Sequence, residues 1–230
     1  MRESFLASAF AHRPHDLLWV GNASALRPVE ALPAWASTAW LAVAPVVVRR
    51  APFLGDRVPV GVRGVSRSER CAAHVHAHQV IGKVTPQDIA RDVSGRLALR
   101  HSRLPCLRAL ARLARELDEA ALSWGVTGSV GFTLASGFDV LRAESDLDLL
   151  VRAVDASDAK ALREIGRLAG DAESRVDVQV ETPCGAFALN EWLRTGGPVL
   201  LKTAEGPVLC DDPWHAADLD AAQPGGHVTA

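Results

Sequence analysis

The clearest hydrophobic pattern in the chain is a helical repeat over residues 105–122, PCLRALARLARELDEAAL. Leu107, Leu110, Leu113 and Leu117 recur at intervals of three and four residues, with arginine and acidic residues between them. This spacing places the leucines on one face of an amphipathic helix. Shorter segments with helical spacing or helix-capping residues predict further helices at 85–93, 129–137, 158–168 and 187–194.

Short apolar runs and alternating patterns predict strands in both halves of the chain. Residues 16–64 combine runs such as AWLAVAPVVV with turn residues such as FLGD, which is typical of several short strands. In the second half, SDLDLLV (145–151) and RVDVQVE (175–181) alternate polar residues with leucine or valine. HVHAHQVIGKV (74–84) alternates in a similar way and predicts one continuous strand, and VLLKT (199–203) predicts another.

The uneven distribution of these elements predicts an α+β fold with two domains. Strands dominate the N-terminal part, so residues 1–95 are expected to form a small β-rich domain. Helices and strands follow one another after it, so residues 96–220 are expected to form an α/β domain. The last residues, 221–230, are expected to be a disordered tail.

Composition limits the classes of function. The net charge of −2 argues against nucleic-acid binding, which needs an extended positive field. The four cysteines form no CxxC pair, which excludes zinc-ribbon and thioredoxin motifs and favours a reducing cytoplasm. The longest apolar run, Ala39–Val48, is too short to span a membrane, and the N-terminal MRESFLASAFAHRP is a poor secretion signal. We therefore expect a cytoplasmic protein with neither a nucleic-acid nor a membrane partner.

The two acidic strands indicate a possible chemistry. Successive side chains point to opposite faces of a strand, so Asp146 and Asp148 share one face, as do Asp177 and Glu181. If the two strands are neighbours, Asp177 joins Asp146 and Asp148, and a bound divalent cation would relieve the repulsion of three carboxylates. Oxygen ligands suit Mg²⁺, which completes its shell with water and substrate phosphate. We interpret the three aspartates as catalytic Mg²⁺ ligands; the alternative is a solvated acidic face.

A turn upstream of the first acidic strand suits phosphate binding. Gly128 and Ser129 follow an apolar segment and open a predicted helix. The start of a helix presents backbone N–H groups and the positive end of the helix dipole to an anion. A phosphate-binding turn together with carboxylates that hold Mg²⁺ is what phosphoryl or nucleotidyl transfer requires.

This set of residues, Gly128-Ser129, Asp146-Leu147-Asp148 and a later Asp177, resembles the signature of the polymerase-β-type nucleotidyltransferase superfamily. Further segments extend the likeness over most of the chain: RPHDLLWV (13–20), GVRGVSRSER (61–70), VTPQDIA (84–90), TGSVGFTLASG (127–137), SDLDLLV (145–151), RVDVQVETPCGAFALNEW (175–192) and VLLKTAEGPVL (199–209). Together these segments resemble one branch, the phosphoribosyl-dephospho-CoA transferases of malonate decarboxylase, which are its holo-acyl-carrier-protein synthases.

The resemblance implies a fold and a reaction. The fold would be a nucleotidyltransferase domain preceded by a small β-rich domain. A serine of the malonate decarboxylase acyl carrier protein would attack 2′-(5″-triphosphoribosyl)-3′-dephospho-CoA and release pyrophosphate. Asp146 and Asp148 would ligate Mg²⁺, Asp177 would complete the acid cluster, and Gly128 and Ser129 would hold the triphosphate.

Three other functions remain open at this point. The chain could be another nucleotidyltransferase that uses ATP or UTP on a protein or small molecule, or a relative specialised for the carrier protein of citrate lyase. It could also be a binding subunit that has lost catalysis. The presence of all three aspartates favours an enzyme.

Basic residues outside this set are weaker candidates for substrate binding. Arg63, Arg67 and Arg70 lie close together in GVRGVSRSER and could bind phosphate, because the guanidinium group offers donors in a planar fork. Lys202 interrupts the apolar strand VLLKT and could bind a phosphate at the end of that strand. The alternative for the arginines is a solvated loop, and for the lysine a side chain that extends to solvent.

A run of alternating histidines has no assigned role. His74, His76 and His78 would share one face of a continuous strand. Three imidazoles on one face could bind a metal ion, but no fourth ligand is evident in the sequence. A polar face on an edge strand is the simpler interpretation.

Overall fold

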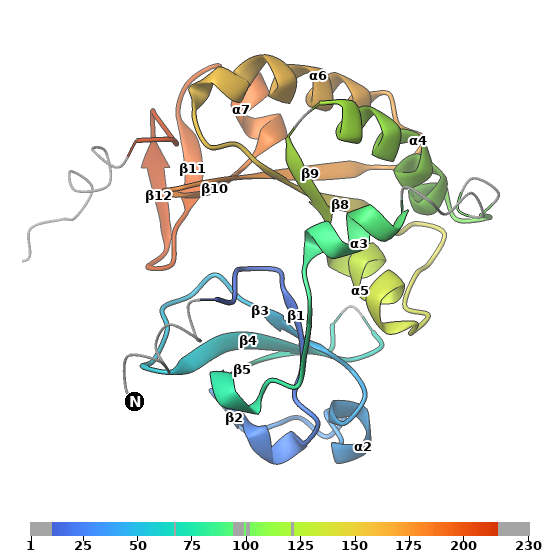
Figure 1. The fold of residues 1–230 in the computed structure, drawn as a ribbon, viewed down its shortest axis with the longest axis vertical. Helices are drawn as coiled ribbons and strands as arrows, with labels where there is room; N and C mark the ends of the chain where they lie inside the picture. The colour runs from blue at the N-terminus through green and yellow to red at the C-terminus, as the bar shows by residue number, and fades with distance from the viewer. Residues whose placement is uncertain (1–10, 67, 94–98, 100–101, 121, 216–230) are drawn as a thin grey trace, which may run out of the picture.

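The fold is α+β, as the sequence predicts (Figure 1). It contains two sheets: short helices connect the strands of the first, and longer helices pack against the second. The computed structural model describes residues 11–66, 68–93, 99, 102–120 and 122–215. Within these residues the chain forms two six-stranded sheets, one from the N-terminal part and one from the C-terminal part. The proposed division near residue 95 and the tail at 221–230 fall outside the described residues, so both stay predictions.

The first sheet is antiparallel throughout and is built from short strands, as the turn-rich sequence of residues 16–64 predicts. Its strand order is β2-β5-β4-β3-β1-β6. The bounds of its strands are β1 (Leu17–Trp19), β2 (Leu26–Pro28), β3 (Val46–Val48), β4 (Arg57–Arg63), β5 (Arg70–His76) and β6 (Gly82–Val84). Short helices connect them: η1 (Ala23–Ala25), α2 (Thr38–Leu41) and η2 (Ala77–Gln79).

The second sheet contains a parallel pair that brings the two acidic segments together. Its strand order is β12-β11-β10-β9-β8-β7, and only β8 and β9 among the strands of this sheet run parallel. The helix α6 (Ala159–Gly170) crosses over between these two strands, as a parallel pair requires. The bounds are β7 (Ser123–Val126), β8 (Leu147–Arg152), β9 (Val176–Thr182), β10 (Gly185–Ala188), β11 (Val199–Lys202) and β12 (Pro207–Cys210).

The predicted helices are confirmed, with small shifts at their ends. The helices are α3 (Pro86–Val93), α4 (Pro105–Glu119), α5 (Gly128–Ser136), η4 (Ala156–Asp158), α6 (Ala159–Gly170) and α7 (Leu189–Thr195). The helix α3 begins with reciprocal capping, because Asp88 N–H donates to Thr85 Oγ1 (3.1 Å) and Thr85 N–H donates to Asp88 Oδ2 (2.8 Å). The helix predicted from residue 187 begins two residues later, since Phe187 pairs with Val180 in the second sheet.

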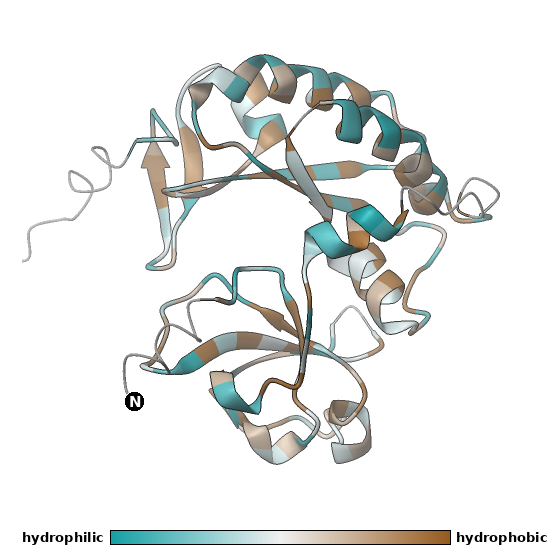
Figure 2. Cartoon of the chain, viewed as in Figure 1, coloured by the Kyte–Doolittle hydropathy of each residue, from teal (hydrophilic) through white to brown (hydrophobic). Residues whose placement is uncertain are grey.

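The main hydrophobic core lies between the second sheet and its helices. Leu110, Leu113 and Leu117 of α4 are at most 2% exposed, which confirms the predicted apolar face. Hydrophobic and hydrophilic residues alternate around α4 and α6 in Figure 2, so each helix packs one side against the sheet. Truncation of one such leucine to alanine typically costs about 2–5 kcal/mol. No helix among the described residues is long and apolar enough to cross a membrane.

The prediction of one continuous strand over residues 74–84 is wrong. The strand β5 ends at His76 because its partner β4 begins at Arg57, the residue that pairs with His76. Beyond that point the chain bends into η2, with Ala77 N–H donating to the Asp56 carbonyl (3.1 Å). It then crosses to the opposite edge of the first sheet, where β6 pairs with β1. Consequently His78 lies in a turn, not on the strand that carries His74 and His76.

Candidate functional site

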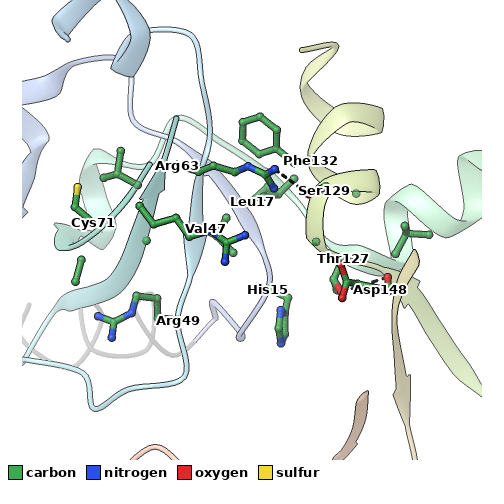
Figure 3. A pocket seen from close by; sticks show the side chains of 17 residues that line it. His15, Leu17, Val47, Arg49, Arg63, Cys71, Thr127, Ser129, Phe132 and Asp148 are labelled. Carbon is green, nitrogen blue, oxygen red and sulfur yellow. Dashed lines mark hydrogen bonds between the residues drawn. The ribbon is translucent and has the colours of Figure 1, made fainter. Parts of the chain in front are cut away.

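A cavity of about 550 Å³ lies where the first sheet faces the start of α5 and the strand β8. Figure 3 shows Arg63, Arg49 and His15 on the side of the first sheet, and Ser129 and Asp148 on the side of the second. The volume is within the range of small-molecule sites. Because its walls come from both sheets, the cavity depends on how the two halves of the chain pack.

Gly128 shapes the wall of the cavity that belongs to the second sheet. It joins β7 to α5 with a φ of +61°, a conformation that favours glycine. Asp148 lies directly beside it, since a Cβ on Gly128 would stand 2.6 Å from Asp148 Cγ. The backbone is tied to the same residue, because Thr127 N–H donates to the Asp148 carbonyl (2.9 Å). The absence of a side chain at this turn therefore lets the carboxylate of β8 lie against the start of α5.

Arg63 connects the two walls of the cavity. Its side chain is largely buried, with the residue 7% exposed, and its Nη2 donates to Ser129 Oγ (2.8 Å). The guanidinium group also stacks over the Phe132 ring, 5.0 Å from its centroid. Arg49 and Arg70 line the same cavity. Three cationic side chains thus line the cavity, and one of them, Arg63, reaches the first turn of α5, where backbone N–H groups have no partner within the helix.

His15 is a neutral imidazole at the edge of the cavity. Burial, and then the charge of Arg50, lower its pKa to about 4. The Gln179 amide nitrogen lies 2.9 Å from His15 Nε2 and donates to it, so Nδ1 carries the ring hydrogen. His15 has a φ of +74°, a conformation that side-chain-bearing residues adopt only at some cost. Backbone strain is concentrated at functional sites, and here it falls on a partly buried, uncharged histidine that lines the cavity.

The three predicted carboxylates are brought near one another but do not form a closed cluster. Asp148 and Asp177 are direct partners on the parallel strands β8 and β9, and Asp146 comes just before β8. Asp148 lines the cavity, whereas Asp177 is paired with Arg175 (3.0 Å) and its side chain is 39% exposed. The ligand atoms of the three do not lie within 4.8 Å of one another, in contrast to another trio among the described residues.

The predicted basic residues differ in their position relative to the cavity. Arg63 and Arg70 line the cavity, while Arg67 is outside the described residues. Lys202 is exposed at the end of β11 and does not line it. Sequence reasoning missed two lining residues, Arg49 and His15. The available signals were an arginine pair directly after the apolar run of β3 and a histidine–aspartate pair directly before β1.

A partly buried ion network joins the two sheets. Glu181 of β9 accepts from Arg50 (2.8 Å) and from Arg152 (2.9 Å), and its side chain is only 12% exposed. Burial raises the pKa of Glu181, but the hydrogen bonds from the two arginines outweigh it and hold the pKa below its ordinary value. Because Arg50 follows β3 of the first sheet, this network fixes the two walls of the cavity relative to each other.

The fold and the site define an α+β protein with a cation-lined cavity between two sheets, an arrangement suited to a ligand that carries phosphate groups. Comparison with known families identifies it further. Residues 13–86 match the phosphoribosyl-dephospho-CoA transferase MdcG N-terminal domain, and residues 93–213 match the MdcG C-terminal domain. The chain therefore belongs to the phosphoribosyl-dephospho-CoA transferase family, which is a transferase family, and the predicted resemblance is confirmed.

Curated relatives cover nearly the whole chain. A phosphoribosyl-dephospho-CoA transferase of Klebsiella pneumoniae (strain 342) is 46% identical over 88% of this chain and 96% of its own length. That of Pseudomonas syringae pv. tomato is 42% identical over 93% and 99%, and that of Pseudomonas aeruginosa is 40% identical over 90% and 96%. No solved structure matches this chain significantly.

Proposed function

We propose that this protein transfers the phosphoribosyl-dephospho-CoA group from 2′-(5″-triphosphoribosyl)-3′-dephospho-CoA to a serine of the malonate decarboxylase acyl carrier protein. The family supports the transferred group. The observation that carries the proposal is the cavity, which is lined by Asp148 and the Gly128 turn together with Arg49, Arg63 and Arg70. A triphosphate is highly charged, and this cavity offers both cations and helix N–H groups to it.

The reaction requires positioning and charge neutralisation more than covalent chemistry by the protein. The serine oxygen forms a bond to the α-phosphorus, the bond from that phosphorus to the pyrophosphate oxygen breaks, and the serine proton is lost. We assign Arg63, which contacts Ser129 and Phe132, to stabilise the charge that collects on the leaving pyrophosphate. We assign Asp177 to accept the serine proton, because it is half-exposed beside Asp148. We assign the Nδ1–H group of neutral His15 as a hydrogen-bond donor to the substrate, which adds no charge to the site.

The carboxylates suit Mg²⁺. Oxygen donors from Asp146, Asp148 and Asp177 are the ligand type that this ion prefers. The structure provides a recess for the central carboxylate, since a side chain at Gly128 would fill the space beside Asp148. When bound, Mg²⁺ would neutralise phosphate charge near these residues.

The site of the reaction is proposed to be the cytoplasm. The four cysteines form no CxxC pair in the sequence, and this spacing favours a reducing compartment.

Intact-mass analysis of the apo carrier protein tests the proposal. The protein is incubated with the triphosphoribosyl substrate, Mg²⁺ and the carrier protein, and a mass gain of one phosphoribosyl-dephospho-CoA group is expected. Asp148→Asn should lower the rate at least about 100-fold, as loss of an electrostatic catalytic group does. Asp139→Asn, an exposed aspartate of the same part of the chain, is the matched control and should leave the rate unchanged.

Three results would contradict the proposal. An adduct formed from ATP or UTP, with none from the triphosphoribosyl substrate, would identify a different nucleotidyltransferase. Full activity of Asp148→Asn would exclude the assigned carboxylate role. Tight binding of substrate and carrier protein without turnover would indicate an inactive binding subunit.

A further inference from the structure

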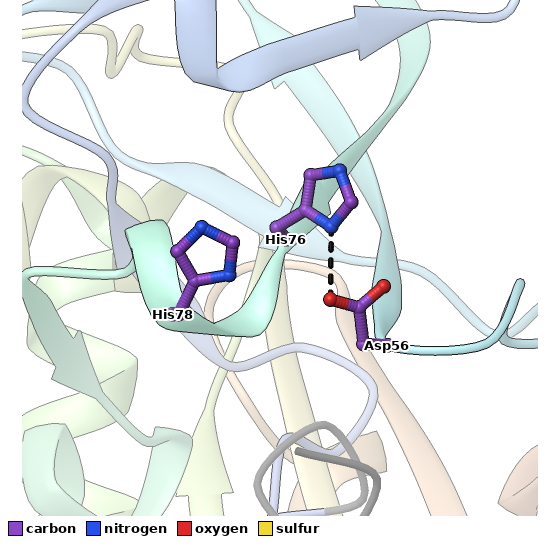
Figure 4. A group of neighbouring side chains, drawn as sticks. All are labelled: Asp56, His76 and His78. Carbon is purple, nitrogen blue, oxygen red and sulfur yellow. Dashed lines mark hydrogen bonds and ion pairs between the residues drawn. The ribbon is translucent and has the colours of Figure 1, made fainter. Parts of the chain in front are cut away.

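A second cluster of polar side chains lies at one end of the first sheet, and none of its members lines the cavity. It consists of Asp56, His76 and His78 (Figure 4). One ligand atom from each residue lies within 4.8 Å of the other two, and this is the group of three possible metal ligands found among the described residues. The proposed transfer reaction uses none of these residues.

Pairing between β4 and β5 brings the first two members together. His76 at the end of β5 is the register partner of Arg57, so Asp56 lies diagonally beside it. His76 Nδ1 and Asp56 Oδ2 are 3.0 Å apart and are hydrogen-bonded. The backbone of this corner is also fixed, because Ala77 N–H donates to the Asp56 carbonyl (3.1 Å).

The turn η2 brings in the third member. On a continuous strand, the Cα atoms of residues two apart are separated by about 6.6 Å along the strand. Because β5 ends at His76 and the chain bends into η2, the rings of His76 and His78 lie with their centroids 5.3 Å apart. With the chain bent into η2, the His78 ring lies beside the His76 ring and completes the cluster.

We propose that Asp56, His76 and His78 form a binding site for a divalent transition-metal ion of the Zn²⁺ class. Two imidazole nitrogens and one carboxylate oxygen are a common ligand set for Zn²⁺, with water in the fourth position. Donor atoms within 4.8 Å of one another need only small side-chain rotations to reach about 2.0–2.2 Å from one ion. The side chains of His76 and Asp56 are 24% and 33% exposed, so an ion can enter without unfolding the sheet.

The nitrogen ligands separate this site from the carboxylates around Asp148. Mg²⁺ prefers oxygen ligands and binds weakly to imidazole. The ion of this site would join the turn before β4 to the turn after β5, and so stabilise the first sheet. The inference does not rest on the proposed transferase reaction, because its readout is metal affinity.

Titration of the metal-stripped full-length protein with Zn²⁺, or with Co²⁺ followed by its visible absorption, tests the proposal. Excess Mg²⁺ is present to occupy sites made of carboxylates alone. One equivalent is expected to bind, and His78→Gln and Asp56→Asn should each weaken binding at least tenfold. His78 is exposed, so this variant should fold normally. At a metal concentration of about 100 times Kd, a bound ion raises stability by RT ln(1 + [L]/Kd), which corresponds to a rise in Tm of several degrees.

His74 provides the matched control. It lies on β5 two residues before His76 but outside the cluster, so His74→Gln should change the affinity less than twofold. Equal loss of binding in His74→Gln and His78→Gln would show adventitious binding to surface histidines and overturn the proposal. Unchanged affinity in both His78→Gln and Asp56→Asn would overturn it as well, leaving a hydrogen-bonded Asp56–His76 pair with no metal role.

Discussion

Replacement of Gly128 by alanine is the sharpest test of how the cavity is built. The left-handed φ of +61° alone costs a residue with a Cβ about 1–2 kcal/mol. The added methyl group would also stand 2.6 Å from Asp148 Cγ, and such overpacking costs about 1–3 kcal/mol. We therefore expect Gly128→Ala to lower the free energy of unfolding by about 2–5 kcal/mol. Displacement of the Asp148 carboxylate by about 1 Å should lower the transfer rate roughly 100-fold.

The other end of the same helix provides the control. Gly137 caps α5 with a φ of +77°, but a Cβ there would meet nothing within 4 Å. Gly137→Ala should therefore cost only the backbone part, about 1–2 kcal/mol, and leave the transfer rate unchanged. Urea unfolding measures the free energies, and intact-mass analysis of the carrier protein measures the rates.

A double-mutant cycle separates the two contributions at Gly128. Asp148→Gly removes the whole side chain that the new methyl group would meet, including its Cβ at 2.8 Å, so Gly128→Ala should cost about 1–2 kcal/mol in that background. The reasoning is refuted if Gly128→Ala matches Gly137→Ala in both stability and rate. Strict additivity of the Gly128 and Asp148 substitutions would refute the proposed contact even if both single variants are inactive.

Two further predictions concern the dependence of stability on pH. The pKa of His15 is about 4 in the folded chain, against 6.5 when unfolded. The unfolded chain therefore takes up the proton first, and the free energy of unfolding falls by about 3 kcal/mol as the pH is lowered from 6.5 to 4. His15→Asn, which tolerates positive φ, should flatten the urea-derived stability curve in this window, and an unchanged slope would contradict a buried neutral imidazole. Glu181 has a lowered pKa, so its stabilisation is present above about pH 4.5 and is lost as pH falls through the folded pKa. Glu181→Gln should lower the free energy of unfolding by on the order of 2 kcal/mol at pH 7, and by progressively less below pH 4.5. Glu119→Gln, which removes one partner of an exposed pair, should cost less than about 0.5 kcal/mol. Equal effects of the two substitutions would refute a structural role for the partly buried network.

Local patterns were sufficient to predict features that depend on a single helix or strand. The leucine spacing of α4 and the alternation of β8 and β9 report which side chains face the core, because both follow from the geometry of a single element. The Thr85 cap of α3 was predictable for the same reason. The strand predicted over residues 74–84 failed because strand length depends on a partner, and β4 provides none beyond His76.

The sequence by itself determined the α+β class, the helix faces, the family, and the acidic residues Asp146, Asp148 and Asp177 as candidates. Only the tertiary structure decided that Asp148 lines the same cavity as His15 and Arg49, and that Lys202 does not line it. The physical reason is that periodicity specifies the face of an element on which a side chain lies, but not the distant element opposite it. That partner depends on sheet order and on how the two sheets pack, which arise from contacts between segments more than 60 residues apart, such as Arg63 with Ser129.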